Sequence, residues 1–214
     1  QMCIRDRPFE IHVIGTPSEE SLDGGKNEMA AHGGFDHIDV AFMVHGSTLT
    51  QLETPSLALI EMDVEFHGKT AHAGIAPYAG RSAVDAVTML QTGLGLMRNH
   101  LKDSSRVSNI VLAGGTAVNS VPDFAKVKVE IRHSSMAYLE SVEQWTREIA
   151  QAAAMATQTQ VQITPVAHIY NTTINDAMGA LLMECAEKFA CGGIAPPRKD
   201  CGSTDFGAVT HRLP

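Results

Sequence analysis

Two stretches of alternating apolar and charged residues constrain the fold of this chain more than any other feature of its sequence. In residues 57–66 every second position is apolar, and Glu61, Asp63 and Glu65 stand between these positions. Residues 126–132 alternate in the same way, with mainly basic residues on the polar positions. Because a period of two puts successive side chains on opposite faces of a strand, both stretches predict strands with one buried and one solvated face.

The segments around these two strands complete a six-element pattern. Helical spacing of apolar residues predicts two helices, and two shorter apolar runs predict two more strands. In chain order, the predicted elements are strand 57–66, helix 82–97, strand 108–113, strand 126–132, helix 138–155 and strand 161–166. The order βαββαβ is the ferredoxin-like arrangement, one antiparallel sheet with two helices on one face. The acids of the first strand and the lysines of the third could then lie side by side on the open face.

The flanking sequence predicts a different class of structure. Residues 8–15 form a short β-rich run, and residues 38–45 form the continuous apolar run that is typical of a buried parallel strand. A loop and a polar helical segment separate the two runs, which together give an α/β signature. We therefore expect an α/β domain in two parts, residues 8–56 and 169–214, interrupted by the α+β insertion at residues 57–168.

Composition excludes several classes of protein. The hydrophobic share of 44% and charged share of 19% are typical of a globular chain, and no apolar run approaches the roughly 18 residues of a membrane helix. Sixteen Lys and Arg against 24 Asp and Glu give a net charge of −8, which disfavours a nucleic-acid partner. Four cysteines without a CxxC motif favour a reducing, cytoplasmic compartment. Residues 1–7 resemble a translated adapter sequence, and residues 210–214 carry no capping or tail signal, so we expect a fragment truncated at both ends.

Three residues near the first part of the chain could support hydrolytic chemistry. Glu19 and Glu20 are adjacent acids in a loop directly after a predicted strand, where α/β proteins carry their sites. One acid could bind a metal while the other holds a water, although a solvated acidic turn is the simpler alternative. His45 ends the apolar run and suits a zinc ligand, or it is a histidine satisfied at a strand end.

Further candidates lie in the insertion and at the end of the chain. His72 lies in a Gly-rich loop and could protrude, Asn119 could bind a ligand carbonyl, and Arg132 could fork onto a carboxylate. The alternatives are an exposed turn histidine, a turn-closing asparagine and a surface ion pair. Asp205 and His211 could each be a ligand or a bystander.

Five motifs in order resemble one known family. They are GTPSEE (15–20), GKTAHAGIAPYAGRSAVDA (68–86), GGTAVNSVPD (114–123), VEIRHSS (129–135) and GSTDFGAVTH (202–211). Together they resemble the zinc-dependent metallopeptidase and amidohydrolase family of glutamate carboxypeptidase, aminoacylase and the indole-acetyl-amino-acid hydrolases. The similarity covers residues 9–214 and is greatest to the aminobenzoyl-glutamate hydrolase and Xaa-Arg (β-alanyl-lysine) dipeptidase branch.

The resemblance implies roles for the residues near the start of the chain. Glu19 would be the general base that activates a metal-bridging water, and Glu20 and His45 would be metal ligands. The cofactor would be two divalent ions, zinc or else manganese or cobalt. The family's other ligands, in an upstream His/Cys pair and a later Ile-His-Pro-like segment, have no counterpart in this sequence. We therefore expect an incomplete ligand set, poor metal binding and no activity in this polypeptide, and an active enzyme in its parent protein.

The resemblance also implies roles for the insertion. It would be a lid and dimerisation domain that makes a homodimer. His72 would polarise the scissile carbonyl, often from the partner subunit, while Asn119 and Arg132 would hold the substrate's carbonyl and terminal carboxylate. The expected function is metal-dependent hydrolysis of an amide or peptide bond in a small N-acyl amino acid or dipeptide. A non-enzymatic dimeric ligand-binding module with a decayed catalytic shell is the alternative.

Overall fold

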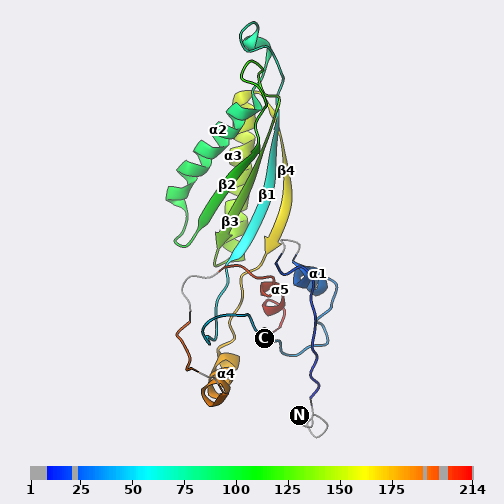
Figure 1. The fold of residues 1–214 in the computed structure, drawn as a ribbon, viewed down its shortest axis with the longest axis vertical. Coiled ribbons are helices and arrows are strands. Elements are labelled where there is room, and N and C mark those ends of the chain that lie inside the picture. The colour runs from blue at the N-terminus through cyan, green and yellow to red at the C-terminus, as the bar shows by residue number, and fades with distance from the viewer. Residues whose placement is uncertain (1–8, 21–23, 190–191, 198–201, 214) are drawn as a thin grey trace.

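A four-stranded antiparallel sheet, covered on one face by two long helices, forms one end of the molecule (Figure 1). The computed structural model describes residues 9–20, 24–189, 192–197 and 202–213. The sheet and its helices comprise β1 (Ala58–His67), α2 (Ala83–Met97), β2 (Arg106–Ala113), β3 (Phe124–His133), α3 (Met136–Thr157) and β4 (Gln160–Ile169). Single turns of 3-10 helix lie at Pro77–Ala79 and Arg98–His100.

The strand order confirms the βαββαβ pattern. Neighbouring strands run in the order β2-β3-β1-β4, and each bonded pair is antiparallel. β1 lies between β3 and β4, while β2 and β4 form the two edges. All six predicted elements occur, with ends that differ from the expected positions by a few residues. Among the residues that the structure describes, no helix combines the length and apolar character that crossing a membrane requires.

The apolar face of the sheet packs against both helices. Alternate residues of β1 and β3 are fully buried there, together with one stripe of α2 and one of α3. Each helix begins at a serine cap, because the hydroxyls of Ser82 and Ser135 accept backbone N–H bonds three residues on. Gly93 lies against Ile149 of α3 so closely that an added Cβ would overlap its side chain. A residue that weakens an isolated helix thus lets α2 approach α3.

The opposite face of the sheet carries a ladder of ion pairs. Asp63 lies directly opposite Lys128, and Glu65 lies opposite Lys126. The ammonium of Lys126 is 2.7 Å from Asp63 and 2.9 Å from Glu65, and that of Lys128 is 2.6 Å from Glu61. The hydrogen bonds that Lys126 donates to Asp63 and Glu65 raise the pKa of Lys126, and the bond that Lys128 donates to Glu61 raises the pKa of Lys128. The predicted pairing of acids and lysines is therefore confirmed.

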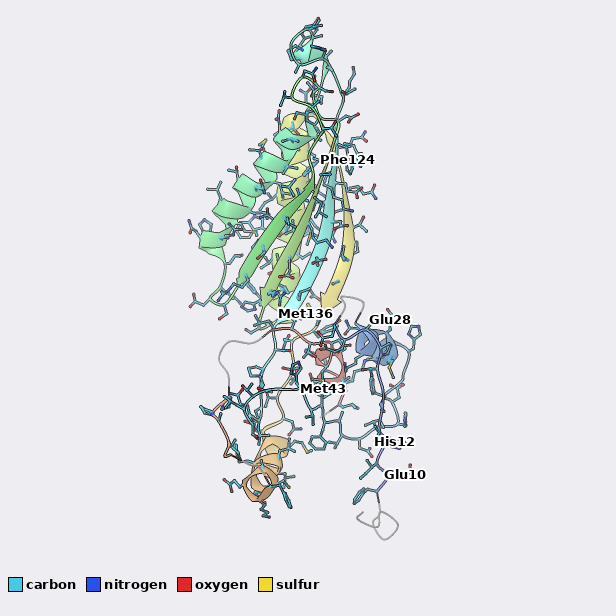
Figure 2. All side chains as sticks on the ribbon, in the orientation of Figure 1. Glu10, His12, Glu28, Met43, Phe124 and Met136 are labelled. Atoms are coloured by element: carbon cyan, nitrogen blue, oxygen red, sulfur yellow. The ribbon has the colours of Figure 1, made fainter. Side chains whose placement is uncertain are left out.

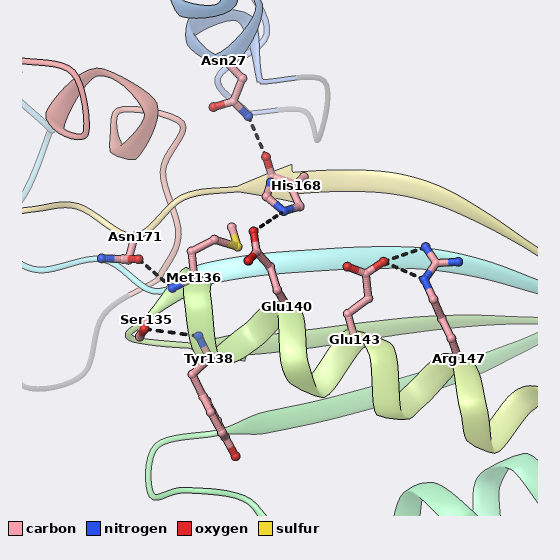
Figure 3. A network of polar contacts seen from close by, with 9 residues as sticks. All are labelled: Asn27, Ser135, Met136, Tyr138, Glu140, Glu143, Arg147, His168 and Asn171. Atoms are coloured by element: carbon pink, nitrogen blue, oxygen red, sulfur yellow. Dashed lines mark hydrogen bonds and ion pairs between the residues drawn. The ribbon is translucent and has the colours of Figure 1, made fainter.

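Three shorter helices lie beyond one end of the sheet (Figure 1). They are α1 (Gly25–Ala31), α4 (Asp176–Phe189) and α5 (Gly207–Thr210). A small cluster that includes buried residues of α1 and α5 joins these two helices. The side chain of Asn27 in α1 donates to the backbone oxygen of His168, and Asn171 accepts from the N–H of Met136 (Figure 3). The first bond connects the sheet with α1, and the second joins the segment after β4 to the start of α3.

The prediction of strands near the start of the chain is wrong. Neither residues 9–15 nor residues 38–45 contain a strand, and Phe42 and Val44 are 59% and 96% exposed. Residues of both segments instead line a space of about 1180 Å³. A buried parallel strand requires bonded neighbours and cover on both faces. The described residues supply neither to these segments, so their apolar pattern alone does not make them strands.

Candidate active site

Glu19 lies in a short loop just before α1, where the backbone takes an unusual conformation. Ser18 has a φ of 57°, a left-handed conformation that costs a non-glycine residue on the order of 1 kcal/mol. Glu19 is half-buried and Glu20 is exposed. The hydroxyl of Thr204 donates to Glu19 Oε1 at 3.0 Å. The loop therefore presents two adjacent acids differently, one bonded to a distant segment and one facing solvent.

Two consecutive residues of the C-terminal segment connect Glu19 with Arg132. Arg132 Nη1 donates to the hydroxyl of Ser203 over a long distance of 3.4 Å, while the hydroxyl of Thr204 contacts Glu19. The Cα atoms of neighbouring residues are about 3.8 Å apart. The candidate base and the candidate carboxylate-binding residue therefore approach the same dipeptide, at the end of the sheet nearest α1 and α5.

Most of the guanidinium of Arg132 is engaged by its neighbour Glu130. Nε donates to Glu130 Oε1 at 2.7 Å, and Nη2 donates to Oε2 at 2.9 Å. This fork occupies the side of the guanidinium that best matches a carboxylate. The remaining side, with Nη1, faces Ser203. Arg106 of β2 lies directly opposite Arg132 in the sheet, so two arginines meet at this end of the open face.

A buried ion pair holds the C-terminal segment against α1. Lys26 Nζ lies 2.6 Å from Asp205 Oδ1, and the backbone N–H of Lys26 donates to Oδ2 at 3.0 Å. Both residues are buried. An added Cβ on Gly25 would collide with the backbone oxygen of Pro17, so the glycine lets the loop that carries the two acids pack closely on the start of the helix.

His72 and Asn119 lie together at the far end of the sheet. Their loops are joined by a bridge between His72 and Ser120, and by a bond from the N–H of Ala73 to the oxygen of Asn119. Both His72 and Asn119 are exposed. Nδ1 of His72 accepts the N–H of Gly74 at 3.2 Å. A neutral ring in this arrangement carries its proton on Nε2, so Nε2 is a hydrogen-bond donor.

The length of the sheet separates these two residues from Glu19 and Arg132. Figure 2 labels Phe124, at the start of β3, at the end of the sheet away from α1, and Met136, just after β3, at the opposite end near α1. Ten residues of β3 at about 3.4 Å each span roughly 30 Å. Within one chain, His72 and Asn119 therefore lie much too far from Glu19 to contact the same small molecule.

The candidate metal ligands do not form a cluster in the described part of the chain. His45 is exposed, and its Nδ1 lies 2.8 Å from the backbone oxygen of Gly46. Within residues 9–20, 24–189, 192–197 and 202–213, no group of three or more His, Cys, Asp and Glu could hold a metal ion. A catalytic zinc normally has three protein ligands, so these residues do not fit a complete metal site.

Asp205 and His211, which the sequence left open as ligands or bystanders, each bond to other parts of the chain. Asp205 pairs with Lys26, and Nε2 of His211 bonds the backbone oxygen of Asn171 at 2.9 Å. Sequence reasoning overlooked Ser203 and Thr204, the two residues that meet Arg132 and Glu19. The motif GSTDFG contains both, but nothing in its spacing indicates which distant side chains its hydroxyls contact.

This chain is similar to a known domain family and to several known enzymes. Residues 58–158 match the peptidase dimerisation domain. The chain is 32% identical to Xaa-Arg dipeptidase of Mus musculus over 211 residues, 97% of this chain and 49% of that protein. It is also 32% identical to a p-aminobenzoyl-glutamate hydrolase chain of Escherichia coli (strain K12) over 174 residues, 78% of this chain and 36% of that protein.

A solved structure agrees with these relatives. An aminobenzoyl-glutamate utilization protein from Klebsiella pneumoniae superimposes with a TM-score of 0.72 at 26% identity, over 86% of this chain and 49% of that one. The chain spans about half the length of the first curated relatives it matches, 49% and 48%. Both of these relatives are Xaa-Arg dipeptidases. Residues 58–158 are therefore identified as a peptidase dimerisation domain.

Proposed function

We propose that the whole protein hydrolyses an amide or peptide bond in a small N-acyl amino acid or dipeptide. In this proposal Glu19 is the general base, His72 polarises the scissile carbonyl, and Asn119 and Arg132 hold the substrate. The named relatives, a dipeptidase and an aminobenzoyl-glutamate hydrolase, support this class of reaction.

The approach of Glu19 and Arg132 to one dipeptide is the observation that carries the proposal. Thr204 bonds the carboxylate of Glu19, and Ser203 meets the guanidinium of Arg132. A base must lie close to the bond that it helps to break, and the Nη1 side of Arg132, which the fork with Glu130 does not use, can hold the carboxylate of a substrate beside it. These two contacts support a site for a substrate with a carboxylate close to its amide bond.

The proposed residues account for each proton of the reaction. Glu19 takes a proton from a water whose oxygen attacks the carbonyl carbon. The negative charge that develops on the carbonyl oxygen is met by the Nε2–H of His72. The C–N bond then breaks, and Glu19 returns the proton to the leaving nitrogen. The products are a carboxylic acid and an amine, and the acid then loses its remaining proton to the amine or to solvent, which leaves a carboxylate.

The distance between the two groups of residues supports a site shared by two chains. His72 and Asn119 lie about 30 Å of strand away from Glu19 and Arg132 in the same chain. We propose that the insertion at residues 57–168 acts as a lid and dimerisation domain between catalytic parts at 8–56 and 169–214. The loops that carry His72 and Asn119 in one copy would then cover Glu19 of the other.

The two edges of the sheet differ in a way that favours β2 as the dimer contact. β2 exposes Ile110, Val111 and Leu112 in succession. β4 contains Pro165 and pairs with β1 through a register shift, two features that protect an edge from further pairing. We propose that β2 pairs with its copy across a two-fold axis.

Metal binding is a separate part of the proposal. Glu20 and His45 are two candidate donors for divalent ions such as zinc, manganese or cobalt. Two donors fall short of the three protein ligands of a catalytic zinc. We expect this chain alone to bind such ions weakly and to be inactive.

The substitution Glu19→Gln in the full-length protein tests the proposed function. It removes the base but keeps the shape of the side chain, so turnover of dipeptides and N-acyl amino acids is expected to fall by about 100-fold or more. Substrate affinity, measured by calorimetry, is expected to change little. Full turnover in the variant excludes Glu19 as the base. A wild-type protein that binds these compounds without cleaving them supports the ligand-binding alternative.

A further inference from the structure

We propose that Thr204 is a positioning residue that sets the orientation of the Glu19 carboxylate. The inference rests on the proposed function of Glu19 as the base. Thr204 Oγ1 donates to Glu19 Oε1 at 3.0 Å, across 185 positions of the chain. An ionised carboxylate can only accept, so the hydroxyl proton points to Glu19. The bond engages Oε1, and Oε2 is left to take a proton from water.

The local backbone does not fix the side chain of Glu19 by itself. The residue belongs to neither a helix nor a strand, and the preceding Ser18 has a left-handed φ. Its carboxylate is half-buried at the end of a side chain with three rotatable bonds. A bond from a separate segment is therefore needed to select one orientation of this carboxylate.

Thr204 itself is held by its own segment. Its hydroxyl oxygen accepts the backbone N–H of Phe206 at 3.4 Å, and its backbone oxygen accepts the N–H of Gly207 at 3.3 Å. The first bond occupies a lone pair of the hydroxyl, which directs its proton away from Phe206. An added Cβ on Gly207 would collide with the backbone oxygen of Tyr170, so the turn packs closely on the chain after β4.

The neighbours of Thr204 connect this segment to the rest of the site. Asp205 forms the buried pair with Lys26 in α1, the helix that follows the loop of Glu19. Ser203 contacts Arg132. Three consecutive residues therefore fix the distance between the candidate base and the candidate carboxylate-binding group. Small displacements of a reacting group can cost a large factor in rate.

The substitution Thr204→Val in the full-length protein tests this role, because valine keeps the shape of threonine and removes the hydroxyl. We expect kcat to fall by roughly 10- to 100-fold, with KM and the thermal midpoint almost unchanged. Thr204→Ser should restore most of kcat, because it returns the hydroxyl. Thr92→Val, on the exposed side of α2, is the matched control and should keep full activity.

Each outcome decides a different point. Wild-type kcat in Thr204→Val, or a Thr204→Ser variant as slow as the valine variant, overturns the positioning role. A wild-type protein that hydrolyses no amide overturns the proposed function instead. In that case a crystal structure of the valine variant still decides the inference, because a Glu19 carboxylate in its original orientation would show that Thr204 does not set it.

Discussion

Lys26 and Asp205 form an ion pair 2.6 Å long between segments that are 179 positions apart in the chain. Their side chains are 10% and 1% exposed. The pair joins the first turn of α1 to Asp205, which directly follows Thr204 in the chain. It therefore connects the two segments that supply the candidate base and its bonding partner.

Removal of one partner of this pair is expected to destabilise the protein. Lys26→Met leaves the buried carboxylate of Asp205 without its counter-charge, which should lower the free energy of unfolding by about 3 kcal/mol or more. Urea denaturation measures the change. Lys26→Met/Asp205→Asn should recover much of the loss, because the amide oxygen can still accept the backbone N–H of residue 26. Lys188→Met, at an exposed lysine, should change stability by less than about 0.5 kcal/mol.

The lysines of the open sheet face should make stability fall at alkaline pH. Hydrogen bonds with Asp63 and Glu65 raise the pKa of Lys126, and the bond with Glu61 raises that of Lys128, above the ordinary 10.5. A raised folded-state pKa gives a stabilising effect that is complete below the unfolded pKa and is lost as pH rises through the folded one.

Urea denaturation at about pH 8 and above pH 10.5 measures this effect. Lys126→Gln/Lys128→Gln should lose less stability across that range than the wild type does. Lys69→Gln/Lys188→Gln changes two exposed lysines and should lose as much as the wild type. An equal loss in all three proteins would contradict the ion-pair account.

The proposed sharing of the site between two chains predicts complementation. Glu19→Gln and His72→Ala should each be inactive in the full-length protein. After mixing and reassembly, one of the two sites in each mixed dimer has both residues intact, so activity should return to at most about one quarter of wild type. Glu19→Gln mixed with Arg132→Ala is the control and should stay inactive, since both residues serve the same chain's site. No recovery with His72→Ala would refute a site completed by the second copy.

A lysine on the proposed dimer edge should separate the subunits. Leu112→Lys adds a charge to β2 and should raise the dimer dissociation constant by about tenfold or more, as measured by sedimentation. Val166→Lys makes the same kind of change on β4, where the side chain is 39% exposed, and should leave the dimer intact. The reverse result, with β4 sensitive and β2 insensitive, would assign the contact to the other edge.

Alternation along two strands, together with two shorter apolar runs, was enough to derive the sheet. The period of two in residues 57–66 and 126–132 defines which side chains face the helices, and the ion pairs of Asp63 and Lys128 follow from the antiparallel register. The same reasoning failed at residues 38–45, because an apolar run becomes a buried strand only when bonded neighbours cover it. Gly93, which weakens a helix in isolation, packs directly against Ile149 in the folded protein.

The sequence by itself determined the six elements of the sheet and its two helices, the open charged face and the acids and histidines able to do chemistry, because these depend on spacing between near neighbours. Only the tertiary structure decided which of them meet. It brought Thr204 to Glu19 and Ser203 to Arg132, and it separated His72 and Asn119 from Glu19 by the length of a strand. Contacts between residues as far apart as Glu19 and Thr204 depend on how the whole chain closes, and no local period encodes that closure.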